Sequence, residues 1–202
     1  MMSTSIMAAR PTQAAIDSKN DVGSPVDYSF KSLTGFDDVE DEEPRKSAHK
    51  LSKTDDGKYE SLAIKFNNNT LTEIIGLEKV VKFLLVNPME LSWLDLSMND
   101  ITKLDNEILQ FSSLKMLYLH GNGIMNLPEI DKLSGLPNLI TLTLHGNPID
   151  TQKGYRQYVL AKLSGIRTLD FSRVTKADRM DALTWNKMFG KKKHGRKKTQ
   201  ED

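Results

Sequence analysis

The fold of this chain is decided by the segment LSWLDLSMNDI, residues 91–101, which places apolar residues at fixed positions around an asparagine. The same spacing returns in LKMLYLHGNGI (114–124) and LITLTLHGNPI (139–149). A weaker copy stands in SLAIKFNNNTL (61–71), where Ser61 replaces the first leucine. The shared asparagines lie 30, 23 and 25 residues apart; they are Asn69, Asn99, Asn122 and Asn147. Recurrence at this period predicts stacked copies of one structural unit.

Each part of the repeat L-x-x-L-x-L-x-x-N-x-L has a physical role. Its x-L-x-L portion alternates, so we expect a short strand with leucines facing inward. The asparagine stands where the chain turns, and its amide can satisfy backbone groups that would otherwise be buried unpaired. Apolar residues between the strands recur every three or four positions, which indicates short helical or 3-10 segments. The pattern predicts an α/β fold: a short right-handed leucine-rich-repeat solenoid with a parallel sheet on its concave face and helical or 3-10 segments on its convex side.

The segment between the first two strands is the longest and predicts a true helix. Thr70 and Glu73 have the spacing of a capping box, and apolar residues follow at helical intervals up to Leu85. Pro88 would stop this helix.

A solenoid exposes its core at the last turn unless another element covers it. After the fourth repeat, residues 155–163 predict a helix, and Leu169 and Phe171 begin a fifth strand. The repeat then ends, because Val174 stands where the asparagine belongs. We therefore expect a cap over residues 151–189, built on Tyr155, Arg156, Val159, Leu169, Asp170 and Val174.

Several motifs together resemble a family of intracellular leucine-rich-repeat proteins with a C-terminal cap. They are PVDYSF (25–30), the repeats LYLHGN and LTLHGN, GYRQYVL (154–160), LDF (169–171) and VTKADR (174–179). The resemblance covers about 25–188, and the family's usual glutamate is Asp178 here, which keeps the carboxylate. It implies a cytoplasmic protein of four or five repeats, without a known catalytic role, that occurs in ciliated cells.

Composition and charge divide the 202 residues further. The chain has no cysteine and no apolar run long enough to span a bilayer, and residues 1–20 lack the apolar stretch of a secretory signal. We expect a cytoplasmic protein without membrane insertion, ciliary if the resemblance holds, with a nuclear location as the weaker alternative. Residues 1–60 predict a mostly disordered acidic leader in which Asp27–Phe30 could dock; residues 61–150 hold four repeats, 151–189 the cap, and 190–202 a basic disordered tail.

Binding in such a fold uses the outward positions of the strands. Because neighbouring strands lie about 4.8 Å apart, Trp93, Met116 and Tyr118 should form one exposed patch, of a composition enriched at interfaces. The occupant could be another protein or the chain's own leader. The expected binding residues of the concave face are Trp93, Asp95, Met116, Tyr118, His120, Thr141, Thr143 and His145.

The sequence offers no catalytic constellation, so we expect neither an enzyme nor a cofactor. Gly121-Asn122-Gly123 belongs to a repeat turn, and the stacked pair His120 and His145 lacks the further ligands that zinc needs. We expect a monomer, outside its assembly, that binds a protein and no small-molecule substrate. Three functions stay open: a cytoplasmic or ciliary adaptor or structural subunit, a nuclear ribonucleoprotein scaffold, and a phosphatase regulator. The basic run 191–198 could aid solubility, contact an anionic surface or direct nuclear import.

Overall fold

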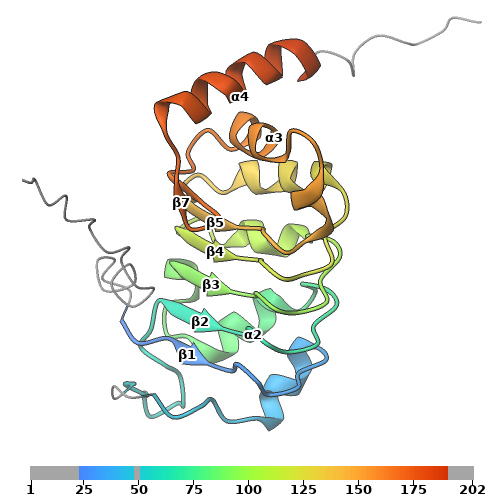
Figure 1. The fold of residues 1–202 in the computed structure, drawn as a ribbon. Coiled ribbons are helices and arrows are strands. Elements are labelled where there is room, and N and C mark those ends of the chain that lie inside the picture. Colours follow the sequence, from blue (N-terminus) through green and yellow to red (C-terminus); the bar gives the residue numbers. More distant parts are fainter. Residues whose placement is uncertain (1–22, 48–50, 191–202) are drawn as a thin grey trace, which may run out of the picture.

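Short strands stack in chain order to form one solenoid, which the computed structural model describes for residues 23–47 and 51–190 (Figure 1). Strands β1 to β6 run parallel and β7 is antiparallel to β6. In order they are β1 (Val26–Asp27), β2 (Ala63–Lys65), β3 (Trp93–Asp95), β4 (Met116–Tyr118), β5 (Thr141–Thr143), β6 (Thr168–Leu169) and β7 (Ser172–Arg173). The predicted leucine-rich-repeat solenoid with a parallel sheet is confirmed.

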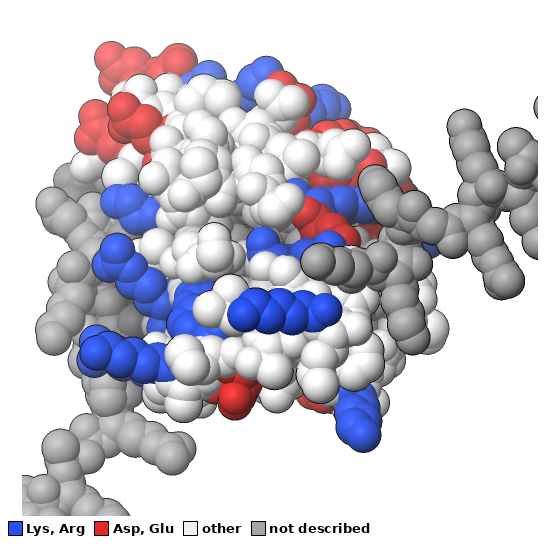
Figure 2. Space-filling view, turned by 90° about the horizontal axis from the view of Figure 1, so that it is seen from above, with Lys and Arg blue, Asp and Glu red and all other residues white. Residues whose placement is uncertain are grey.

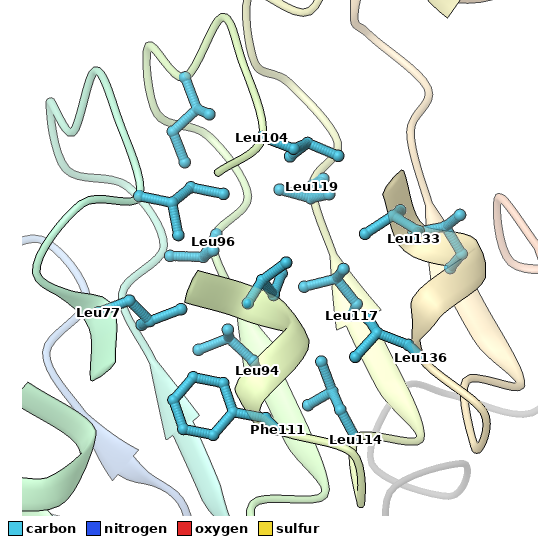
Figure 3. Close-up of a cluster of buried hydrophobic side chains, with 14 of the residues drawn as sticks. Leu77, Leu94, Leu96, Leu104, Phe111, Leu114, Leu117, Leu119, Leu133 and Leu136 are labelled. Carbon is cyan, nitrogen blue, oxygen red and sulfur yellow. The ribbon is translucent and has the colours of Figure 1, made fainter. Parts of the chain in front are cut away.

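The register of the sheet follows the sequence repeat. Leu94 in β3 pairs with Leu117 in β4, which pairs in turn with Leu142 in β5. All three leucines are fully buried, and Figure 3 shows the strand leucines facing side chains such as Leu104 and Phe111 from the opposite side of the solenoid. Equivalent residues of successive repeats therefore form continuous columns through one core.

The convex side is built from the helical and 3-10 segments that the spacing predicts. The 3-10 segments are η1 (Phe36–Asp41), η2 (Pro88–Glu90), η3 (Asn106–Gln110), η4 (Leu127–Gly135) and η5 (Pro148–Thr151). The α-helices are α2 (Leu77–Leu84), α3 (Tyr155–Lys162) and, at the end of the solenoid, α4 (Lys176–Phe189).

Helix α2 begins later than the capping-box spacing predicts. Its N-terminal boundary is Gly76, whose left-handed φ of 90° separates the helix from the preceding loop. Thr70 does not cap it, because it lies well before the helix; its hydroxyl donates to the carbonyl oxygen of Leu33, 3.0 Å away. The capping-box prediction was therefore wrong, since a capping hydroxyl must accept a backbone N–H of the first helical turn and this helix begins at Leu77.

The repeat asparagines bind one turn of the solenoid to the next. Asn122 donates from its amide to the carbonyl oxygens of Leu119 in its own repeat and Leu96 in the preceding one, each at 3.0 Å. Its Oδ1 accepts from the backbone N–H of Ile101, also at 3.0 Å. Asn99 and Asn147 make the corresponding bonds. Since these amides are buried, removing one would leave several backbone groups unpaired, at a cost of roughly 1–3 kcal/mol for each.

The segment before the first full repeat covers the N-terminal end of the core. Strand β1 pairs in parallel with β2, and the ring of Tyr28 stacks on Phe66 at 5.8 Å between centroids. Phe36 meets the same ring edge-on at 5.2 Å, and Leu33 and Val39 are buried beside it. Asn69 fixes this cover by accepting from the backbone N–H groups of Lys31 and Leu33.

This arrangement corrects the expectation of a mostly disordered leader for residues 23–47 and 51–60. The acidic composition of the segment predicts disorder, but its apolar residues close the open end of the solenoid. Part of the acidic run is η1, where Asp38 accepts from the backbone N–H of Thr34 and Asp37 pairs with Lys79 at 3.0 Å. Asp27 and Tyr28 dock as the sequence suggested, whereas the Phe30 side chain is exposed.

The C-terminal cap replaces the repeat by a polar network. The Asp170 carboxylate accepts from the backbone N–H groups of Leu144 and His145 and from the Tyr155 hydroxyl. Arg156 makes two hydrogen bonds to Asp178, which also caps α4 through Thr175. Val159 and Leu169 are buried in the end of the core, and Val174 packs partly buried against it.

The expected basic tail lies outside the described residues except for Gly190, as does the start of the leader. Across residues 23–47 and 51–190, no helix is both long and apolar enough to cross a membrane.

Candidate functional site

The outward side chains of β2, β3 and β4 meet on the concave face, as the repeat alignment predicts. Ala63, Trp93, Met116 and Tyr118 form a second apolar cluster, separate from the core, with Leu62 at its border. Trp93 and Tyr118 come from adjacent strands, and their rings pack edge to face at 5.8 Å between centroids. Such pairs contribute about 0.5–1.5 kcal/mol beyond the area they bury.

The sequence predicts an exposed concave patch, but the structure buries it. The exposed fractions of Trp93, Met116 and Tyr118 are only 6%, 0% and 2%. The polar members of the expected set, Asp95, Thr141 and Thr143, are also buried. Counting strand positions showed which side chains share the face, but it did not account for large rings on adjacent strands covering one another.

Phe171 supplies the exposed aromatic surface that the sequence analysis missed. The spacing predicts Phe171 within a fifth strand, yet β6 ends at Leu169 and the chain turns through left-handed conformations at Asp170 and Phe171. The Phe171 ring is 43% exposed and lies 5.6 Å from the rings of Tyr118, His120 and His145. The absence of asparagine at Val174 was the available signal that this turn would differ.

The two histidines of the face stack on each other. The rings of His120 and His145 are nearly parallel, 4.7 Å apart between centroids, and His120 Nδ1 lies 2.8 Å from the Thr143 hydroxyl. Burial, helped by the neighbouring His145, lowers the pKa of His120 from 6.5 to about 4. His120 is therefore uncharged at neutral pH. His145 remains about half exposed, with its Nδ1 3.4 Å from Asp170 Oδ1.

A hollow of about 340 Å³ opens beside these rings at the C-terminal ends of β2, β3 and β4. Asp95 is its acidic group: burial raises the pKa of this carboxyl, and hydrogen bonds from the Ser97 backbone N–H and hydroxyl oppose the rise. Lys65, on the adjacent strand, pairs with Asp27 at 3.4 Å. The principal lining residues are Lys65, Asn67, Trp93, Asp95, Tyr118 and Phe171.

Two polar atoms of the lining residues are buried without a hydrogen-bond partner. They are Asn67 Oδ1, an acceptor, and Trp93 Nε1, a donor. Leaving such a group unpaired costs about 1–3 kcal/mol. Both atoms are closed off from solvent, so a ligand in the hollow does not reach them unless the side chains move.

A second apolar surface lies on α4, which the sequence predicts only as part of the cap. The exposed side chains there include Met180, Leu183 and Met188. Figure 2 looks down on this end of the molecule and shows a broad area of uncharged side chains between charged groups. A hollow of about 600 Å³ is lined by residues of α4, among them Thr184, Trp185 and Met188, and by Gly154 and Gln157 at the start of α3.

Within residues 23–47 and 51–190, no three His, Asp or Glu side chains gather closely enough to hold a metal ion.

Comparison with known proteins agrees with this architecture. A family model described as leucine-rich repeat matches residues 63–201. Leucine-rich repeat-containing protein 51 of Homo sapiens is 48% identical over 164 residues, which cover 81% of this chain and 85% of the relative. The protein of the same name from Mus musculus is 48% identical over 174 residues, covering 86% and 91%.

A chain in the crystal structure of the Drosophila melanogaster SNF/U2A' complex has a similar fold. It matches with a TM-score of 0.53 and 27% sequence identity, covering 61% of this chain and 67% of that one. The relatives and this neighbour support a protein-binding scaffold as the general role of the chain.

Proposed function

The chain belongs to the leucine-rich-repeat family, and we propose that it is a non-catalytic adaptor or structural subunit that binds a protein partner through its concave face. The observation that carries this proposal is the surface where Phe171 meets Tyr118, His120 and His145. We call these four residues the aromatic rim.

The aromatic rim has the features of a binding anchor. A large ring stands 43% exposed at Phe171, and the stacked histidines and the buried Tyr118 hold it from below. Interfaces concentrate their binding energy in a few aromatic and arginine side chains near well-packed pockets. A rigid ring next to a hollow needs little reordering when a partner docks.

Affinity purification with matched variants tests the proposal. Phe171→Asn removes the exposed ring and tolerates the left-handed backbone, because asparagine adopts positive φ more readily than most residues. The control is Phe83→Gln, which removes a ring of similar exposure, 51%, from the convex helix α2. We expect Phe171→Asn to reduce partner recovery from ciliated cells at least tenfold and Phe83→Gln to leave it unchanged. Equal recovery with both variants would remove the aromatic rim from the proposal.

We place the partner in a ciliary or other cytoplasmic assembly, following the resemblance to proteins of ciliated cells. Fluorescence microscopy of the tagged full chain tests this location. A signal along cilia or in the cytoplasm supports it, and a purely nuclear signal contradicts it.

A nuclear ribonucleoprotein scaffold is the second candidate. The basic run 191–198, which lies outside the described residues, and the similarity to a chain of the SNF/U2A' complex favour it. Deleting residues 191–198 should then abolish nuclear accumulation, and a cytoplasmic signal in both forms would count against it.

A further inference from the structure

The hollow beside the aromatic rim has walls suited to a cation. Trp93 and Tyr118 line it together with Phe171, with 5.8 Å between the first two rings and 5.6 Å between the last two. Aromatic faces attract cations, and a guanidinium also stacks on them through its plane. A volume of about 340 Å³ lies at the small end of the range for ligand sites, which fits one side chain and a short stretch of backbone.

The charges around the hollow favour a positive ligand. Ser97 donates twice to Asp95 Oδ1, whereas no described residue donates a hydrogen bond to Asp95 Oδ2. The Lys65 cation is already paired with Asp27. His120 adds no positive charge at neutral pH, because its pKa is about 4. The carboxylates of Asp95 and Asp27 and the ammonium group of Lys65 together leave an excess negative charge beside the hollow.

The Asp95 carboxylate narrows the ligand further. An apolar side chain offers no donor to Asp95 Oδ2. A guanidinium carries five N–H donors in a planar fork, so it can donate to this oxygen while its face lies against the Phe171 ring.

We infer that this hollow receives an arginine side chain of the partner protein, with the guanidinium against the exposed Phe171 ring and directed at Asp95. The inference rests on the proposed function, because the hollow is part of the concave face. It adds the chemical identity of the anchor, which the partner supplies.

A titration of the full-length, ¹⁵N-labelled protein tests this inference. The probe is N-acetyl-arginine amide, and the matched neutral probe is the corresponding citrulline amide. We expect saturable shifts of the backbone signals of residues 93–98 and 118–120 with the arginine probe, and at least fivefold weaker binding of citrulline. N-acetyl-lysine amide should also bind at least threefold more weakly than arginine, because it lacks the planar donor fork. Equal binding of arginine and citrulline, or of arginine and lysine, would overturn the inference.

Two variants test whether the preference for the arginine probe arises in the hollow. Asp95→Asn keeps the size of the side chain and should weaken arginine binding at least threefold. Asp131→Asn is the control, because Asp131 contacts Tyr158 and Lys162 on the convex side, away from the hollow. If Asp95→Asn binds the arginine probe as tightly as the wild type does, the arginine binds elsewhere and not in this hollow.

Arg10, outside the described residues, is the competing occupant from the chain's own leader. A several-fold gain in affinity for the arginine probe in Arg10→Ala would assign the hollow to the leader and overturn the partner assignment. Partner recovery separates the two proposals. If it depends on Phe171 but the probe shows no arginine preference, the inference fails and the proposed function stands. If the probe binds as expected but partner recovery does not depend on Phe171, the inference stands and the aromatic rim is removed from the proposed function.

Discussion

The two ends of the solenoid are closed by different chemistry. At the N-terminal end, Tyr28 and Phe36 pack on Phe66 and close the core by apolar contact, although Phe30 beside them is 64% exposed. At the C-terminal end, hydrogen bonds of Asp170 and the Arg156–Asp178 ion pair hold the cap, while apolar side chains of α4 stay in solvent.

This difference shows which end is complete. Burial of apolar surface needs no further partner, so the N-terminal cover finishes the core on its side. A polar network can hold a turn in place without covering large apolar side chains. The C-terminal end and the adjacent aromatic rim therefore offer the surface that a partner can use.

The largest effect is expected where the N-terminal cover meets the core. Phe66→Ala removes the ring on which Tyr28 and Phe36 both pack and should lower the free energy of unfolding by about 3–5 kcal/mol. Urea denaturation at neutral pH measures it. A loss below about 1 kcal/mol would mean that hydrophobic packing does not hold this end.

Acid should lower the free energy of unfolding through the protonation of His120. Its folded pKa of about 4 is lower than its ordinary value of 6.5, so the unfolded chain binds the proton first as pH falls. The associated stability is present above pH 6.5 and is lost as pH falls toward 4. Because the ring is partly exposed, we expect about 1–2 kcal/mol. Denaturation curves between pH 7 and 4 measure the loss, and His120→Gln should flatten it; an unchanged slope in that variant would refute the assignment.

The Arg156–Asp178 pair should have a smaller effect. Arg156→Gln is expected to cost about 1 kcal/mol at pH 7, since the pair is partly exposed and screened by solvent. The Arg156 guanidinium holds the pKa of Asp178 below its ordinary 3.8. The contribution is therefore complete above about pH 4 and is lost below it, so wild type and variant should converge in stronger acid. Hydrogen exchange should show faster opening of α4 in the variant at pH 7, with β1 unaffected.

The smallest effect belongs to the exposed apolar surface of α4. Leu183→Lys should change the free energy of unfolding by less than about 0.5 kcal/mol, because the side chain is 60% exposed. Thermal denaturation checks this result. A loss above about 1 kcal/mol would show that Leu183 belongs to the fold and would weaken the contrast between the two ends.

The candidate site could be predicted only in part. Strand alternation identified Trp93 and Tyr118 as neighbours on the concave face, because position in a repeat determines which face a side chain occupies. Their burial was missed, since the contact between two rings depends on rotamers and on neighbouring strands. The spacing predicts Phe171 in a fifth strand, whereas the structure turns it out of the strand, because the chain passes through a left-handed turn between β6 and β7.

The local spacing of leucines and asparagines is enough to predict the repeat, its register and the concave columns. How the ends are closed and where the aromatic rim lies depend on tertiary contacts. Thr70 bonds to the N-terminal cover, and Asp170 bonds to the fourth repeat as Phe171 turns outward. These contacts join residues far apart in the chain, and the spacing of nearby residues carries no information about them.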